Sequence, residues 1–186
     1  MRIIAGEFRS RQITAPAGEA TRPTSDKLRG TLFNILSAMG LVEGVRFLDL
    51  YAGSGAVAIE AISRGAAHAF LVENDQDALK ALHKNLKSLD LASEVTVMER
   101  DVANAIHELE RLSRFDVVFL DPPWKDERAY QQTLQQLSNS KLVDEATIVI
   151  AEHEKHFHPE EKYGSLKRFR EHKQGDAVLS FYRIQD

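Results

Sequence analysis

The sequence contains no cysteine, which excludes disulfide frameworks, cysteine zinc clusters and thiol nucleophiles. It also lacks any long hydrophobic run. The longest runs, such as 117–120, are strand-sized, far below the ~20 residues of a membrane span. The N-terminus has no apolar stretch typical of a signal peptide. We therefore expect a cytoplasmic protein with no membrane association.

The overall amino-acid composition is ordinary for a globular domain, but the charged residues are unevenly distributed along the chain. The 186 residues are 43% hydrophobic and 28% charged, which argues against collagen-like and disordered chains. The net charge is -4, yet residues 1–30 hold six cations and three acids, so this segment is basic and the remainder strongly acidic. A second basic stretch lies at 162–173. A basic segment on an acidic body is typical of contact with nucleic acid, although a solvated surface segment can look the same.

The first forty residues are predicted to form a small extension to the main domain. Two short alternating runs, 2–5 and 8–14, flank Gly6 and predict a β-hairpin. A helix then begins after a cap at Thr24 or Ser25. We expect this extension to cover residues 1–40 and the main domain to cover residues 41–186.

In the main domain, apolar strand-like runs alternate with amphipathic helical segments. This alternation predicts an α/β fold with a doubly wound, mostly parallel sheet. Strands are expected at 45–51, 68–73, 95–99, 115–120 and 147–151, and helices at 55–64, 75–89, 102–112 and 127–138. Two consecutive strand candidates, 165–172 and 177–184, predict an antiparallel hairpin that closes the sheet.

A glycine-rich turn follows the first predicted strand of the main domain. Asp49 precedes the turn, which reads Tyr51-Ala52-Gly53-Ser54-Gly55. Glycines allow close approach of a ligand, and ligands of such sheets bind beyond the carboxyl ends of the strands. The dinucleotide fingerprint needs a third glycine, and position 58 is Ala, which argues against a nicotinamide-dependent oxidoreductase. The acid at position 49 favours a cationic ligand.

Further acids follow the next two predicted strands. Glu73 and Asn74 come at the end of one strand, and Asp101 and Val102 at the end of the other. Glu73 could accept from both hydroxyls of a ribose. Asp101 could accept from an adenine amino group. A single acid after a strand is often only a helix cap, but acids at three successive strand ends beside a glycine turn indicate a ligand-binding edge.

The fourth strand of this series ends in Asp121-Pro122-Pro123-Trp124. Consecutive prolines fix the backbone, so the Pro122 carbonyl has a rigid direction. Asp121 adds a second acceptor, and Trp124 adds a flat stacking face. Two acceptors beside a stacking surface suit a planar group that carries an NH2. The alternative is a rigid loop with a core tryptophan.

These two turns resemble those of class I S-adenosylmethionine-dependent methyltransferases that act on amino nitrogens. The N-terminal run Arg2-Ile3-Ile4-Ala5-Gly6 and the later run Arg22-Pro23-Thr24 make the resemblance closer. Both runs are similar to those of the bacterial ribosomal RNA small-subunit methyltransferase D family. The same similarity extends to Arg29, Leu32, Phe33 and Asn34. The resemblance covers essentially the whole chain. It departs from the family at Trp124, where Phe is more usual, and at Gly30, where Glu is frequent.

The resemblance implies a Rossmann-like fold that transfers methyl from S-adenosylmethionine to the exocyclic N2 of a guanine in 16S rRNA. The products would be the methylated base and S-adenosylhomocysteine, with no metal required. The residues expected to bind the donor are Asp49, Tyr51, Ala52, Gly53, Ser54, Gly55, Glu73, Asn74, Asp101 and Val102. Those expected to act on the acceptor are Asp121, Pro122, Pro123 and Trp124. Those expected to contact RNA are Arg2, Arg9, Arg11, Arg22, Thr24 and Arg29.

The expected partner is 16S rRNA within an assembling small ribosomal subunit, and the expected state is a monomer. Other acceptors remain open, because the Asp-Pro-Pro-aromatic turn is shared with adenine methylases. They are the N6 of adenine in DNA or RNA, or a protein amide. A non-catalytic RNA-binding module is opposed by the intact turn. His153, His156 and His158 do not have zinc-site spacing.

Overall fold

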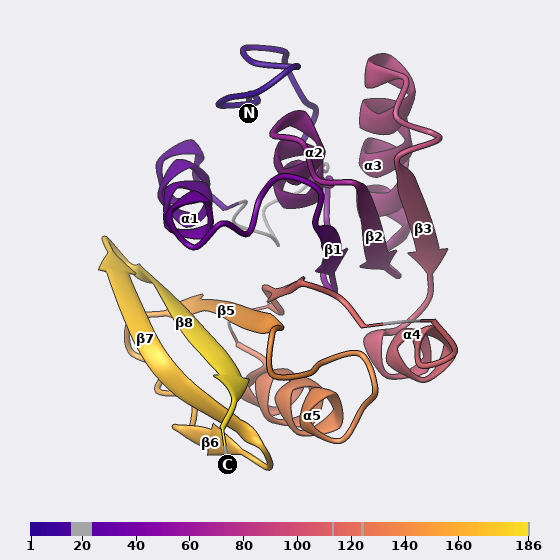
Figure 1. Cartoon of the computed structure of the whole chain (residues 1–186). Helices are drawn as coiled ribbons and strands as arrows, with labels where there is room; N and C mark the ends of the chain where they lie inside the picture. The colour runs from indigo at the N-terminus through magenta and orange to yellow at the C-terminus, as the bar shows by residue number, and fades with distance from the viewer. Residues whose placement is uncertain (16–23, 113, 124, 186) are drawn as a thin grey trace.

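The computed structural model describes residues 1–15, 24–112, 114–123 and 125–185. Within these ranges the helices are α1 (Asp26–Ala38), α2 (Ala56–Ser63), α3 (Gln76–Leu89), α4 (Val102–Leu109) and α5 (Glu127–Ser138). The strands are β1 (Arg46–Asp49), β2 (His68–Glu73), β3 (Val95–Glu99), β4 (Val117–Leu120), β5 (Ile148–Glu154), β6 (Lys162–Tyr163), β7 (Leu166–Gln174) and β8 (Ala177–Ile184). Strands and helices alternate from β1 to β5, as predicted (Figure 1).

The described strands form one eight-stranded sheet in the order β3-β2-β1-β4-β5-β8-β7-β6. Neighbours from β3 to β5 are parallel, and neighbours from β5 to β6 are antiparallel. The chain builds outward from β1 to β3 and then returns to β4, so the strand order reverses between β1 and β4. Such a reversal is where open α/β sheets bind ligands. The predicted sheet and its antiparallel end are confirmed, and β6 is a short addition that the sequence did not predict.

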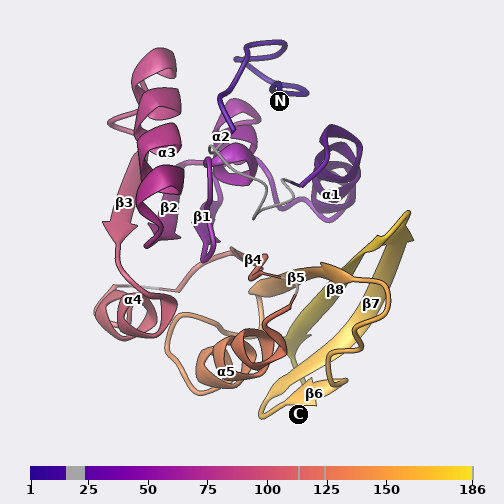
Figure 2. The ribbon, with the colours of Figure 1, turned by 180° about the vertical axis from the view of Figure 1, so that it is seen from behind.

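Helices cover both faces of this sheet (Figures 1 and 2). Residues of α1, α2 and α3 share one hydrophobic cluster with Phe47 and Phe119. Residues of α4 and α5 share the other cluster with Leu48 and Leu120. Every residue of β4 is buried, because a strand covered on both faces buries side chains in both directions. This explains the near-continuous apolar runs in the sequence.

The expected N-terminal β-hairpin is present only in a short form. Residues 1–3 run antiparallel to residues 10–13, with a bridge between Arg2 and Gln12 and backbone hydrogen bonds from Ile3 to Arg11 at 3.0 Å and from Ile13 to Met1 at 3.1 Å. The backbone N–H groups of Ile4 and Ala5 donate to the Glu60 carboxylate on α2, at 2.8 and 3.0 Å. The antiparallel pairing stops after Ile3 because α2 supplies the acceptors for the next two N–H groups.

This N-terminal segment packs on the helices that cover one face of the sheet. Ile3 and Ile13 are buried in the same cluster as α1 and α2. Gly6 has φ +82°, and a Cβ there would overlap the Ser63 carbonyl oxygen, so close packing on α2 requires glycine. The division into residues 1–40 and 41–186 stays a prediction. No helix in the described ranges is both long and apolar enough to cross a membrane.

Candidate active site

The acids predicted at the strand ends lie along one edge of the sheet. Asp49 ends β1, Glu73 ends β2, and Asp101 follows β3 as the N-cap of α4. Asp121 comes directly after β4. Because β1 to β4 are parallel, their carboxyl ends meet at the same edge. The structure therefore brings these four acids to one side of the molecule.

A pocket of about 270 Å³ opens at this edge. Six of the predicted site residues line it: Tyr51, Glu73, Asn74, Asp101, Val102 and Pro123. A wall that sequence reasoning missed comes from α5 and its N-cap: Asp126, Ala129, Gln132, Thr133 and Gln136. Their spacing of three to four residues marks one helix face, and that pattern was available in the sequence.

Glu73 fixes the glycine turn against β2. Its Oε2 accepts from the Gly53 N–H at 2.7 Å. Its Oε1 accepts from the N–H groups of Asn74 and Asp75, both at 2.8 Å. A carboxylate offers about four acceptor sites, so about one remains for a ligand. In this arrangement Glu73 suits one ribose hydroxyl better than two.

Asp49 is the buried acid of the site, with 1% of its surface exposed. Its Oδ1 has no hydrogen-bond partner among the described residues. Burial, followed by the charges of Glu73 and Glu152, raises the pKa of Asp49 to about 7. A buried carboxylate oxygen without a donor is costly unless a ligand supplies one. This orphaned oxygen fits a cationic or N–H-bearing group bound beside the turn.

The glycine turn has one open and one crowded position. Gly53 has φ +56° and no heavy atom within 4 Å of where a Cβ would lie. Gly55 has φ +81°, and a Cβ there would come within 2.5 Å of Leu82. Ala52 and Ser54 are buried, and the Ser54 carbonyl accepts from Asn85 at 2.9 Å. A ligand can therefore approach the turn closely at Gly53, whose N–H is already bonded to Glu73, while Gly55 is needed for packing.

Asp101 is exposed at the outer side of the pocket. Its Oδ1 accepts from the Asn104 N–H at 3.0 Å, and this bond lowers the pKa of Asp101. The carboxylate is therefore charged and also serves as a helix cap. The structure shows the helix-cap role, and contact of Asp101 with an adenine amino group stays a prediction.

The predicted acceptor turn is held by a residue that sequence reasoning missed. The Pro122 carbonyl accepts from the Tyr130 hydroxyl at 3.2 Å, and the same hydroxyl lies 2.9 Å from the Glu152 carbonyl. Tyr130 is fully buried, and burial together with nearby Asp121 and Glu152 raises its pKa well above the ordinary value. Its hydroxyl is thus a permanent donor. Trp124 lies outside the described residues.

The residues expected to contact RNA occupy different environments. Arg2, Arg9 and Arg11 are exposed, and Arg11 donates to the Ser88 carbonyl on α3 at 3.0 Å. Thr24 is buried, and its hydroxyl donates to Glu152 Oε2 at 2.8 Å. Arg22 lies outside the described residues.

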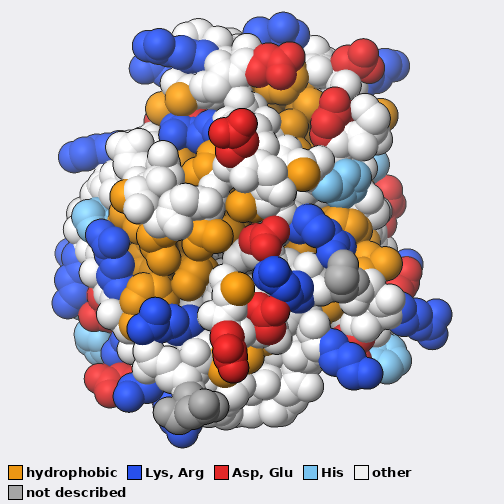
Figure 3. Space-filling model, viewed as in Figure 1, with side chains coloured by type: hydrophobic (Ala, Val, Ile, Leu, Met, Phe, Trp, Pro, Cys, Tyr) orange, Lys and Arg blue, Asp and Glu red, His pale blue; other side chains and the backbone are white. Residues whose placement is uncertain are grey.

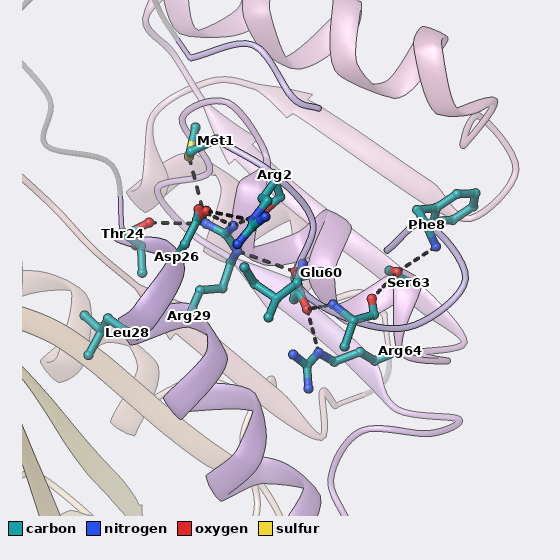
Figure 4. Close-up of polar contacts among 12 residues, drawn as sticks. Met1, Arg2, Phe8, Thr24, Asp26, Leu28, Arg29, Glu60, Ser63 and Arg64 are labelled. Carbon is teal, nitrogen blue, oxygen red and sulfur yellow. Dashed lines mark hydrogen bonds and ion pairs between the residues drawn. The ribbon is translucent and has the colours of Figure 1, made fainter. Parts of the chain in front are cut away.

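Arg29 requires a correction, because it is completely buried and cannot reach RNA in this structure. Its guanidinium donates to the Arg2 carbonyl at 2.5 Å and pairs with Asp26 at 3.0 Å and Glu60 at 3.6 Å (Figure 4). Glu60 also pairs with Arg64 at 2.7 Å. Arg29 therefore anchors the N-terminal segment to α1 and α2. Its charge suggested a surface residue, but its partners are up to 31 positions away.

Within the described part of the chain, no three His, Asp or Glu side chains are grouped so as to hold a metal ion. The buried His153 instead lies 2.9 Å from the Ser180 hydroxyl.

Comparison with known proteins assigns the family. Residues 1–183 match the family described as "Conserved hypothetical protein 95". The chain belongs to this family. The Bacillus subtilis (strain 168) protein named "Putative rRNA methyltransferase YlbH" is 34% identical over 184 residues, covering 98% of each chain. "Ribosomal RNA small subunit methyltransferase D" of Escherichia coli (strain K12) is 37% identical over 152 residues, covering 81% of this chain and 73% of that one.

A solved structure supports the same assignment. The protein described as "Putative methyltransferase yhhF from Escherichia coli" superposes with a TM-score of 0.85 at 30% identity. The match covers 100% of this chain and 98% of that chain. The expected Rossmann-like class I methyltransferase fold is therefore confirmed for this member of the conserved hypothetical protein 95 family.

Proposed function

We propose that this protein transfers the methyl group of S-adenosylmethionine to the exocyclic N2 of a guanine in small-subunit ribosomal RNA. One observation carries the proposal: Pro123 of the acceptor turn and Glu73 of the donor edge line the same pocket. The names of the relatives support rRNA as the acceptor. As further proposals, the protein acts as a monomer on an assembling small subunit.

The donor site is proposed at the carboxyl edge of β1 to β3. When bound, S-adenosylmethionine supplies an electrophilic methyl group on a positively charged sulfur. Asp49 would face the positive charge of the ligand, because its buried Oδ1 lacks a donor. Glu73 would accept from a ribose hydroxyl. Asp101 and Asn74 would border the base, beside Val102.

The acceptor site is proposed at Asp121 and Pro122. A guanine amino group is a weak nucleophile because its lone pair is delocalised into the ring. The two N–H groups of the amine would donate hydrogen bonds to the Asp121 carboxylate and the Pro122 carbonyl. These bonds would localise the nitrogen lone pair and direct it away from the two acceptors. Tyr130 would keep the Pro122 carbonyl in place through its hydrogen bond. Fixed positioning of this kind supplies much of the rate of a transfer between two bound groups.

The acceptor amine loses one proton during the transfer. Asp121 would receive it or pass it to solvent, and Asp121 is only half-buried. Trp124 would stack on the base, as aromatic side chains do with bases extruded from RNA. The Asp121 carboxylate and the Pro122 carbonyl would also bind the N6 amine of adenine, so the identity of the base needs a direct test.

The test is methylation of a small-subunit rRNA transcript and of unmodified small subunits, followed by nucleoside mass spectrometry. We expect N2-methylguanosine from the wild type and none from Asp121→Asn, which should retain donor binding. N6-Methyladenosine as the product would assign the alternative reaction. Absence of any methylated nucleoside from both substrates would contradict the proposal.

A further inference from the structure

A row of three cations crosses the antiparallel end of the sheet. In the register of β6 and β7, Lys162 lies opposite Lys167. In the register of β7 and β8, Lys167 lies opposite Arg183. All three are exposed. Residues directly opposite in antiparallel strands point to the same face, with Cβ atoms about 5 Å apart, and like charges in such positions repel.

A fourth cation, Arg170, lies on the same face. It pairs in register with Phe181, next to Arg183 along β8. Its guanidinium lies 5.7 Å from the centre of the Phe181 ring, and that of Arg183 lies 5.0 Å from the Phe169 ring. Aromatic faces attract cations, so the rings hold both guanidinium groups against the sheet. We call Lys162, Lys167, Arg170 and Arg183 the cationic face.

The carboxylates near the cationic face are committed elsewhere. Glu161 and Glu171 both pair with Arg168, at 3.7 and 3.2 Å. Arg168 lies opposite Tyr182 and Glu171 opposite Ser180, which places them on the other face of the sheet. In the described ranges, none of the four cations forms an ion pair with a carboxylate. Among the residues that the structure describes, their mutual repulsion is therefore not offset by a carboxylate.

We propose that the cationic face binds the phosphate backbone of the RNA substrate, outside the active site. The inference rests on the proposed function in taking rRNA as the partner. Neighbouring strands are about 4.8 Å apart, so the row spans about 10 Å, and flexible side chains can follow successive phosphates. Figure 3 shows Lys and Arg side chains around a hydrophobic area on the side of the molecule where β7 and β8 lie in Figure 1.

The position of the cationic face gives it a role in affinity and not in chemistry. Glu152, next to the acceptor turn, pairs with Leu179, whereas Val149 pairs with Tyr182, the neighbour of Arg183. The row thus lies beside the start of β5, about 13 Å along the strand from Glu152. RNA bound there would flank the target base and not enter the pocket.

The test compares Lys162→Ala/Lys167→Ala with Arg111→Ala/Lys141→Ala, whose two cations are exposed beyond α4 and α5. Filter binding of a small-subunit rRNA fragment is measured across a salt series. Each lost phosphate contact should lower affinity about five- to eightfold at 0.1 M salt and flatten the log-log salt slope by about 0.7–0.9. The Lys162/Lys167 variant should show both changes, and the Arg111/Lys141 variant neither. The Tm of the Lys162/Lys167 variant should equal or exceed that of the wild type, because a pair of like charges in register is removed.

Unchanged affinity and salt slope in the Lys162/Lys167 variant would overturn the cationic-face inference while wild-type methylation of rRNA persists. Loss of binding to phosphatidylserine vesicles with unchanged RNA binding would also overturn it, by assigning the face to a membrane surface. A wild type that neither binds nor methylates rRNA would overturn the proposed function itself.

Discussion

Asp49 and Glu60 are both buried carboxylates, but their partners differ completely. Glu60 accepts from two backbone N–H groups and pairs with Arg29 and Arg64. Asp49 has an oxygen with no partner in the described part of the chain, and its pKa is raised to about 7. A satisfied buried charge ties elements of the fold together. We propose that the unpartnered Asp49 oxygen, which lies at the carboxyl edge of the sheet, is instead kept for a ligand.

The largest expected effect is on the satisfied acid. Glu60→Ala leaves the Arg29 guanidinium buried without its partner on α2, so it should lower the free energy of unfolding by about 3–5 kcal/mol. Urea unfolding measures this, with exposed Glu145→Ala as the control, expected within about 0.5 kcal/mol of wild type. A loss below about 1 kcal/mol for Glu60→Ala would show that the pair is not an anchor.

Replacement of Asp49, the acid with an unpartnered oxygen, should stabilise the protein, in contrast to replacement of Glu60. Its pKa is 3.8 in a model peptide and about 7 in the fold, so the native state binds the proton more tightly between these values. In the absence of S-adenosylmethionine, the contribution of Asp49 to the free energy of unfolding should therefore fall as pH rises from about 4 to 7. The Asp49→Asn variant should not show that fall. The variant should gain roughly 2–4 kcal/mol relative to wild type over this range. Parallel pH profiles in urea unfolding would contradict the assignment.

The same contrast divides the arginines. Exposed Arg9 and Arg11 should bind phosphate, whereas buried Arg29 should only support the segment. Arg9→Ala/Arg11→Ala should flatten the salt slope of RNA binding by about 1.4–1.8, with at most a small fall in Tm from loss of the exposed Arg11–Ser88 hydrogen bond. Arg29→Ala should lower Tm. Filter binding with an unchanged slope for Arg9→Ala/Arg11→Ala would remove the N-terminal segment from the RNA interface.

The smallest expected effect concerns Tyr130. Tyr130→Phe removes the one hydroxyl proton that the Pro122 and Glu152 carbonyls share, a hydrogen bond worth about 0.5–1.5 kcal/mol, so the single-turnover rate should fall by up to roughly tenfold. Donor affinity should not change. Tyr163→Phe is the control, because its hydroxyl bonds the Glu160 N–H instead. Equal rates for both variants would show that Tyr130 does not position the acceptor turn.

The sequence predicted the sheet because its signals are local. The strands at 68–73, 95–99 and 177–184 and the helix at 127–138 lie where the apolar patterns placed them. The acids at positions 49, 73 and 101 were predictable as a group, because parallel strands end at one edge.

What the sequence could not predict depends on contacts between distant residues. The N-terminal hairpin is shorter than predicted because Glu60, more than 50 residues away, accepts from the N–H groups of Ile4 and Ala5. Arg29 is buried by the same contact. Tyr130 acts through two carbonyls, one of them 22 residues away. Hydrogen bonds of this kind have no local pattern, so only the fold reveals them.

The most direct test of the donor site is calorimetric titration of S-adenosylmethionine into Asp49→Asn, with Asp121→Asn as the matched control. Asp49→Asn keeps an acceptor oxygen but removes the negative charge. Hydrogen bonds to charged groups contribute about 1.5–3 kcal/mol and neutral ones about 0.5–1.5 kcal/mol, so the variant should bind S-adenosylmethionine roughly tenfold more weakly. Asp121→Asn should bind it as the wild type does, because Asp121 is proposed to contact only the acceptor amine. Wild-type affinity in Asp49→Asn would contradict the account.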